Sequence, residues 1–308
     1  MKKVLFTTTA LVAFAGAASA DVTLSGSAEM GLVSGDRYGI GSSVQYHNDI
    51  DIKFSLSGET DGGLTFGATI DLDETGGLGT GVGNTGNKSS VFISGNFGTV
   101  TLGDTDGALD WAMQEVGVGS AIADDHTTHV GYNGNSGFDG AYGGQVLRYD
   151  NTFGDFGVAL SANIDDTGAG STAWGIGVKY NTALGGVDLG LGLGYQDRGA
   201  DDIWGVSVDA KFAGGFRAIL NYSDATIAAV NATHTGLGLA YTANALTVSA
   251  NYGEYDVAGV KIDGYGLAVN YDLGGGAVIM AGYGSDVRDA TVANPNGASW
   301  SLGLGLSF

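Results

Sequence analysis

The residues best suited to chemistry lie in one segment, residues 103–144, which carries many acids and neither Lys nor Arg. Its carboxylates could attract cations or ligate a metal. The acids are Asp104, Asp106, Asp110, Glu115, Asp124, Asp125 and Asp139. The segment lacks regular alternation, and a loop this long is usually either functional or disordered. The elements on either side of it therefore decide what the acids do.

Closely spaced acids make calcium a candidate ligand, since this ion takes several oxygen ligands. The weak calcium candidates are Asp104, Asp106, Asp124 and Asp125. Their spacing does not match an EF-hand loop, so the metal assignment stays open and no cofactor is required. The sequence holds no convincing catalytic or dinucleotide-binding motif. The G-x-G-x-x-G match at 81–86 does not open a helix, and neither H-E-x-x-H nor G-x-S-x-G occurs. We expect no catalytic residues and no enzymatic activity.

The first twenty residues predict a secretory signal peptide. Lys2 and Lys3 precede an apolar stretch that ends in Ala18-Ser19-Ala20, which places cleavage before Asp21. Loss of the two lysines leaves 10 Lys and Arg against 33 Asp and Glu, a formal charge of 10 − 33 = −23. Such an acidic chain is a poor partner for nucleic acid, which needs basic patches.

Beyond the leader, apolar residues alternate with polar residues or glycine over about sixteen short runs. Leu189, Leu191, Leu193 and Tyr195, for example, are separated by single glycines. Successive side chains of a strand point to opposite faces, so each run predicts a β-strand with one apolar and one small or polar face. The runs span 22–32, 50–56, 64–72, 87–95, 99–103, 145–151, 156–164, 174–180, 189–195, 203–212, 216–223, 235–242, 246–254, 263–272, 277–284 and 299–308.

The alternation fits two all-β architectures, and the small, polar face of the strands distinguishes between them. A soluble sandwich packs its apolar faces together, whereas a transmembrane barrel turns the apolar face to lipid and the polar face to water. Small polar residues on one face and tyrosines near the run ends favour the barrel, whose sheet must close because lipid tolerates no open edge. Sixteen strands enclose an aqueous lumen. We therefore predict a single domain over 21–308, an antiparallel up-and-down transmembrane β-barrel with short turns at one end and long polar loops at the other.

Four segments resemble the general diffusion porins of Gram-negative bacteria, in particular those of photosynthetic alphaproteobacteria such as Rhodobacter. They are 60–74, 91–109, 271–284 and 299–308, and the similarity extends over essentially the whole mature chain. The resemblance implies export through the periplasm to the outer membrane and a homotrimer of sixteen-stranded barrels. It also implies that the third long loop, which follows the strand at 99–102, folds inward and narrows the pore. That loop is the acidic segment 103–144.

In this family, loop acids face basic side chains on the opposite wall. Alternation places Lys53, Lys88 and Arg148 on the lumen side, and Arg37 lies near the mouth, so these four are the expected wall bases. The lumen side also carries Lys179, Lys211 and Arg217. Because acids outnumber bases, we expect a weak preference for cations.

The predicted function is passive, size-limited diffusion of small hydrophilic solutes and ions, with outer-membrane lipid and lipopolysaccharide as further partners. The main alternative is a substrate-specific outer-membrane channel or receptor. That alternative needs an aromatic path along the lumen, whereas most aromatic residues here fall on the lipid-facing side. An outer-membrane enzyme and a soluble secreted adhesin are weaker alternatives.

Overall fold

The computed structural model describes residues 21–35, 40–76, 82–83, 87–123, 136–139, 141, 145–165, 168–285 and 297–308. The predicted signal peptide, residues 1–20, lies outside these ranges. The described strands are β1 (Asp21–Gly35), β2 (Val44–Glu59), β3 (Thr65–Gly76), β4 (Val82–Gly83), β5 (Asn87–Gly95), β6 (Gly98–Gly103), β7 (Val146–Phe153), β8 (Phe156–Asn163), β9 (Ala173–Leu184), β10 (Val187–Arg198), β11 (Asp201–Phe212), β12 (Phe216–Ile227), β13 (Val230–Ala243), β14 (Leu246–Val257), β15 (Val260–Gly274), β16 (Ala277–Ser285) and β17 (Ala298–Ser307). Each of the sixteen predicted runs corresponds to one of them.

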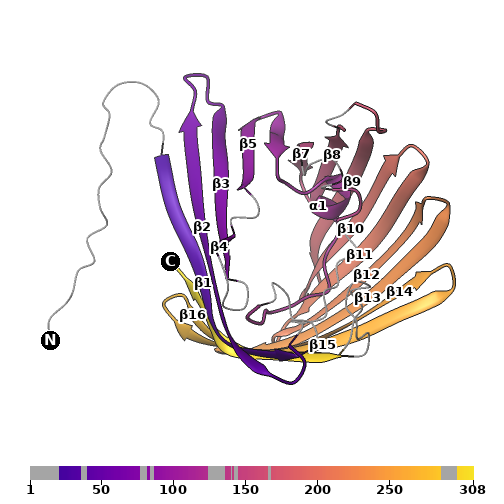
Figure 1. Cartoon of the computed structure of the whole chain (residues 1–308). Helices are drawn as coiled ribbons and strands as arrows, with labels where there is room; N and C mark the ends of the chain where they lie inside the picture. Colours follow the sequence, from indigo (N-terminus) through magenta and orange to yellow (C-terminus); the bar gives the residue numbers. More distant parts are fainter. Residues whose placement is uncertain are drawn as a thin grey trace, which may run out of the picture.

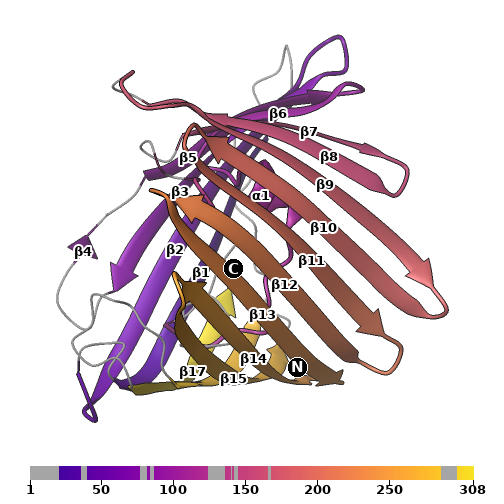
Figure 2. The same cartoon turned by 90° about the vertical axis from the view of Figure 1, so that its right-hand side faces the viewer.

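The sheet closes on itself because its first strand has a partner on each side. β1 pairs antiparallel with β2, where Asp21 faces Ser57, and with β17, where Ser27 faces Ser307. Within the described residues β4 pairs only with the end of β3, so 17 − 1 = 16 strands form the wall. Figures 1 and 2 show these tilted strands as a ring around an interior space. The predicted closed antiparallel barrel is confirmed.

Side chains alternate across the wall as predicted. On β10, Leu193 lies on the outer surface and is 52% exposed. Gln196, three residues later, lies on the inner surface and is 1% exposed. Outward aromatic side chains pair near the strand ends: the ring centroids of Phe216 and Tyr241 lie 4.5 Å apart. An apolar belt with aromatic residues toward its margins is the surface that a bilayer stabilises.

The expected difference between the two ends of the barrel is wrong in part. Gly185-Gly186 forms the predicted tight turn, with φ of 61° and 84°. At the opposite end, however, two-residue connections also join β10 to β11, β12 to β13 and β14 to β15. The second of these is Ala228-Ala229, with φ of 50° and 63°, a left-handed conformation that alanine adopts only at a cost. An alanine pair carries no turn signal, so the β12–β13 connection was not recognisable from sequence, whereas the other two contain Gly199 and Gly259.

Between β6 and β7 the chain turns into the barrel, and this segment contains the helix α1 (Ala108–Ala112). Figure 1 shows α1 inside the ring, near β9 and β10. No helix in the described part of the chain is long and apolar enough to cross a membrane. We call the predicted segment 103–144 the constriction loop; its described residues, 103–123, 136–139 and 141, run inside the barrel as predicted.

Candidate functional site

The constriction loop is held at its base by a clasp around Asp139. Its carboxylate accepts hydrogen bonds from the Gly107 main-chain N–H, at 2.5 Å, and from Nε2 of Gln196 on β10, at 2.7 Å. The Gln196 side-chain oxygen accepts in turn from the Phe138 N–H, at 2.7 Å. One carboxylate and one amide therefore tie the start of the loop, its end and the barrel wall together.

Further along, polar side chains of the wall satisfy the loop's main chain, which has no strand beside it. Ser161 Oγ accepts from the Ala108 N–H at 2.9 Å, and Asn270 donates to the Ser120 carbonyl at 2.6 Å. Glu29 of β1 accepts from the Ala123 N–H at 2.8 Å. Buried peptide groups need such partners, so these contacts fix the path of the loop across the barrel.

Apolar side chains of the loop fill the space between it and the wall. Leu109, Val116 and Ile122 are almost fully buried. Leu109 belongs to a cluster with Phe138 and Ile203, and Ile122 packs with Val33. This burial offsets the entropy lost when the loop is ordered.

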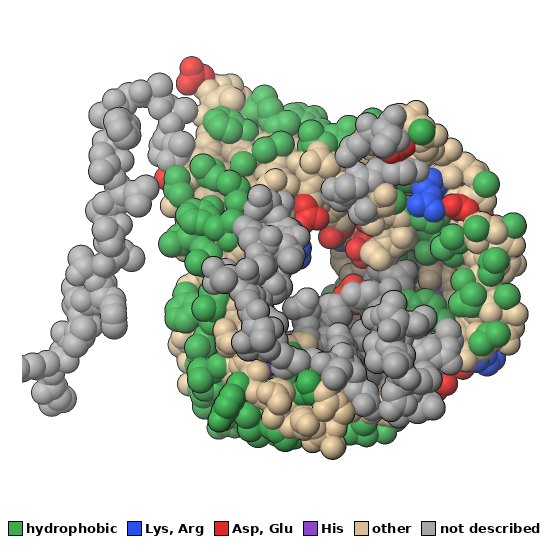
Figure 3. Space-filling model, in the orientation of Figure 1, with side chains coloured by type: hydrophobic (Ala, Val, Ile, Leu, Met, Phe, Trp, Pro, Cys, Tyr) green, Lys and Arg blue, Asp and Glu red, His purple; other side chains and the backbone are tan. Residues whose placement is uncertain are grey.

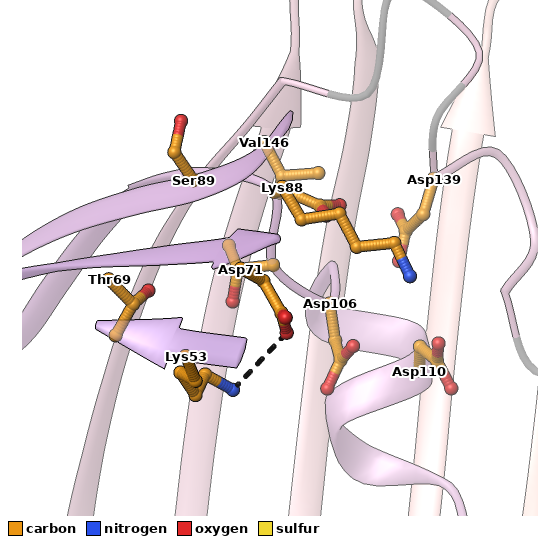
Figure 4. Close-up of a pocket in the computed structure, with 11 residues that line it drawn as sticks. Lys53, Thr69, Asp71, Lys88, Ser89, Asp106, Asp110, Asp139 and Val146 are labelled. Carbon is orange, nitrogen blue, oxygen red and sulfur yellow. Dashed lines mark ion pairs between the residues drawn. The ribbon is translucent and has the colours of Figure 1, made fainter. Parts of the chain in front are cut away.

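On its free side the loop faces a cavity of about 430 Å³. Figure 3 shows an opening through the barrel with acidic side chains at its edge. The cavity is lined by Lys53, Thr69, Asp71, Lys88, Ser89, Asp104, Thr105, Asp106, Asp110, Asp139 and Val146. In Figure 4, Lys53 and Lys88 extend from the wall strands, and Asp106, Asp110 and Asp139 belong to the loop side.

The wall side of the cavity is a row of charges across three strands. Lys53 on β2 faces Asp71 on β3, which faces Lys88 on β5. Lys53 Nζ lies 3.7 Å from Asp71 Oδ2. Asp71 was not among the predicted pore residues, although it shares the lumen-facing side of its run and the turn at 61–63 brings it opposite Lys53.

The predicted acids separate into three groups. Asp104, Asp106, Asp110 and Asp139 line the cavity. Glu115 lies farther along the loop, half-buried and outside the lining. Asp124 and Asp125 lie outside the described residues.

The predicted bases also separate. Lys53 and Lys88 line the cavity, whereas Arg37 lies outside the described residues. Arg148 faces the lumen but holds the loop: its guanidinium donates to the Asp106 carbonyl at 2.7 Å and to Asp150 at 3.0 Å. Lys179, which alternation placed on the lumen side, lies 3.9 Å from the centroid of the Trp111 ring.

Two cavity carboxyls have raised pKa values. Burial raises the pKa of Asp110 to about 7, and the charges of Asp106, Asp139 and Glu115 act in the same direction, opposed by Lys179. Burial likewise raises the pKa of Asp139 to about 6, although its hydrogen bonds from the clasp favour the ionised form. The charge of this site therefore changes within the range of neutral to mildly acidic pH.

No three His, Cys, Asp or Glu side chains gather into a metal site among the residues that the structure describes. The calcium candidates Asp104 and Asp106 lie within that part, and Asp124 and Asp125 do not. Calcium binding stays a prediction.

A family model described as Gram-negative porin matches residues 7–291. A porin from Rhodobacter capsulatus is 30% identical over 292 residues, covering 85% of this chain and 93% of that protein.

Solved structures with the same fold cover 94% of this chain, and each is covered completely. A porin refined at 1.8 Å has a TM-score of 0.72 at 24% identity. A triple mutant of the Rhodopseudomonas blastica porin has a TM-score of 0.65 at 22% identity, and an anion-selective porin from Comamonas acidovorans has a TM-score of 0.67 at 17% identity. The closed barrel, the inward loop and the match along nearly the whole sequence agree: the chain belongs to the Gram-negative porin family.

Proposed function

We propose that this outer-membrane porin passes small hydrophilic solutes and ions by passive, size-limited diffusion and weakly favours cations. The observation that carries the proposal is the cavity between the constriction loop and the wall of β2, β3 and β5. Its lining holds the carboxylates Asp71, Asp104, Asp106, Asp110 and Asp139 and the ammonium groups of Lys53 and Lys88, a formal balance of 2 − 5 = −3. Low-dielectric walls focus the field of such charges on ions in the opening.

The sign of the preference depends on these side chains rather than on the fold. The Comamonas acidovorans porin has the same fold and is described as anion-selective. In this chain every charged side chain that the loop contributes to the cavity is an acid, and Asp71 lies between the two lysines. An ion in the opening therefore meets an excess of negative charge, which raises the local concentration of cations.

The proposal extends to assembly and export. A homotrimer follows from the resemblance to general diffusion porins, and the leader at residues 1–20 supports export through the periplasm. Lipopolysaccharide is the proposed lipid partner, bridged by divalent ions to loop acids. Electrophoresis of unheated and heated samples in detergent tests the trimer: a single species at the monomer mass in both samples contradicts it.

Ion preference is tested by the reversal potential of purified protein in a planar bilayer under a potassium chloride gradient at pH 8. We expect a reversal potential with the sign of potassium selectivity in wild type, and a smaller potential of the same sign in Asp106→Asn. The matched control is Asp61→Asn, in the β2–β3 turn outside the cavity, which removes the same charge and is expected to keep the wild-type potential. A potential with the sign of chloride selectivity contradicts the proposal.

A further inference from the structure

Lumen-facing glycines lie beneath the described part of the constriction loop, on four strands of the wall. We call them the glycine track: Gly177 on β9, Gly192 and Gly194 on β10, Gly205 on β11, and Gly236 and Gly238 on β13. All are buried, while outward neighbours such as Ile176 and Leu193 are exposed. Alternation alone assigns these glycines to a water-filled lumen, but the loop covers them.

The main chain of the loop lies directly against this track. A β-carbon added at Gly177 would be 2.0 Å from the Ala108 carbonyl oxygen, and one at Gly192 would be 2.2 Å from that of Ala112. At Gly238 the added atom would be 2.0 Å from the Val116 carbonyl oxygen. The three carbonyls are spaced four residues apart, so the loop contacts the wall repeatedly at separations that leave no room for any side chain.

At the remaining glycines of the track, side chains of the loop pack directly against the wall. An added β-carbon would come within 2.6 Å of Leu109 at Gly194, 2.7 Å of Met113 at Gly205 and 2.9 Å of Val116 at Gly236. Gly190 gives the contrast. It lies on β10 with the same parity as Gly192, yet an added β-carbon there meets only Asn181 and Asp209 of the wall, at 3.2 and 3.7 Å.

We propose that the glycine track sets the bore of the pore by letting the loop lie flat against the wall. The loop is anchored on one side by the track and bounds the cavity on its other side, so its distance from β9–β13 fixes the space left for solutes. Restoring an ordinary contact at Gly192 or Gly238 requires the loop to move by about 1 Å toward the cavity, because packed atoms do not overlap. These glycines are positioning residues, and the inference rests on the proposed diffusion function.

The test compares single-channel conductance in Gly192→Ala, Gly238→Ala and the control Gly190→Ala. We expect the first two to conduct less than wild type, by a factor of roughly 1.2 to 1.5, because the narrowest section limits ion flow. Gly190→Ala is expected to conduct like wild type. Wild-type conductance in all three overturns the proposed role of the track, whereas an absence of step currents in wild type overturns the diffusion function itself.

A second pair of variants separates loop displacement from damage to the strand. At Gly236 the obstacle is the branched Val116 side chain, so Gly236→Ala is expected to lower conductance and Val116→Ala in the same chain to restore it. If Gly236→Ala folds poorly, its yield of heat-resistant folded barrel is measured with and without Val116→Ala. Failure of Val116→Ala to restore either quantity contradicts an effect through the loop.

Discussion

Lowering the pH from 8 to 5 is expected to weaken cation selectivity, because two carboxyls of the cavity take up protons in this interval. With pKa values of about 7 and about 6, Asp110 and Asp139 each lose about 0.9 of a negative charge, about 1.8 in total. The change is attributable to burial first and to neighbouring acids second, so it belongs to the folded loop and not to these residue types in general.

The size of the effect follows from Coulomb's law. An ion about 6 Å from a unit charge in a water-filled opening gains about 0.7 kcal/mol, and salt at about 0.1 M reduces this by roughly half. Loss of about 1.8 charges then costs a cation about 0.6 kcal/mol and favours an anion by a similar amount. The ratio of cation to anion permeability should fall by a factor of roughly 3 to 10.

The assay is the reversal potential at a fixed salt gradient, measured in steps from pH 8 to pH 5 for wild type and for Asp110→Asn. Wild type should titrate between pH 6 and 7, while Asp110→Asn should start at lower selectivity and retain only a smaller change near pH 6. Asp61→Asn controls for the loss of a charge outside the cavity. Identical titrations of wild type and Asp110→Asn would refute the assignment of the titrating group.

The same pKa values predict that the docked loop is more stable at low pH than at high pH. Both values are raised above the unfolded value of 3.8, so the contribution of these carboxyls to docking is fully present below about pH 4. It is lost as the pH rises through 6 and 7. Open-channel noise from loop motion should accordingly be smaller at pH 5 than at pH 8.

Three further predictions concern the clasp, the wall and a turn. Gln196→Ala removes two hydrogen bonds of the clasp, one to a carboxylate, and should weaken loop docking by about 2 to 4 kcal/mol; open-channel noise equal to that of wild type would contradict it. Lys88→Met removes a cavity base and should shift the reversal potential further toward potassium, and a shift toward chloride would show that the lysine does not face the ion path. Ala229→Gly relieves a φ of 63° and should raise the free energy of unfolding in urea by about 1 kcal/mol, with an unchanged or lower value counting against strain in this turn.

Much of the fold was predictable because lipid outside and water inside impose a two-residue period on every strand. That period located all sixteen wall strands and placed Lys53 and Lys88 on the lumen side. It also isolated the constriction loop as the long segment without alternation. Alternation carries no information on register, which depends on turn geometry, so the pairing of Lys53 with Asp71 was missed.

The roles of individual side chains were less predictable, because they depend on where the loop lies. Arg148 has the parity of a pore base, yet its guanidinium binds the Asp106 carbonyl and fixes the loop. Asp139 was predicted only as a constriction acid, and the structure adds a clasp that joins residues far apart in sequence. The glycines of β10 and β13 have the pattern of a solvated lumen wall, and only the path of the loop shows what covers them.

The most direct test of the account asks whether the cavity between loop and wall is the narrowest part of the conducting path. Thr69 lines this cavity from β3, whereas the next residue, Ile70, is exposed on the outer surface and lies outside the lining. Single-channel conductance should therefore fall sharply in Thr69→Trp and stay at the wild-type value in Ile70→Trp. Wild-type conductance in Thr69→Trp, with the barrel folded, would show that solutes take another route and would contradict the account.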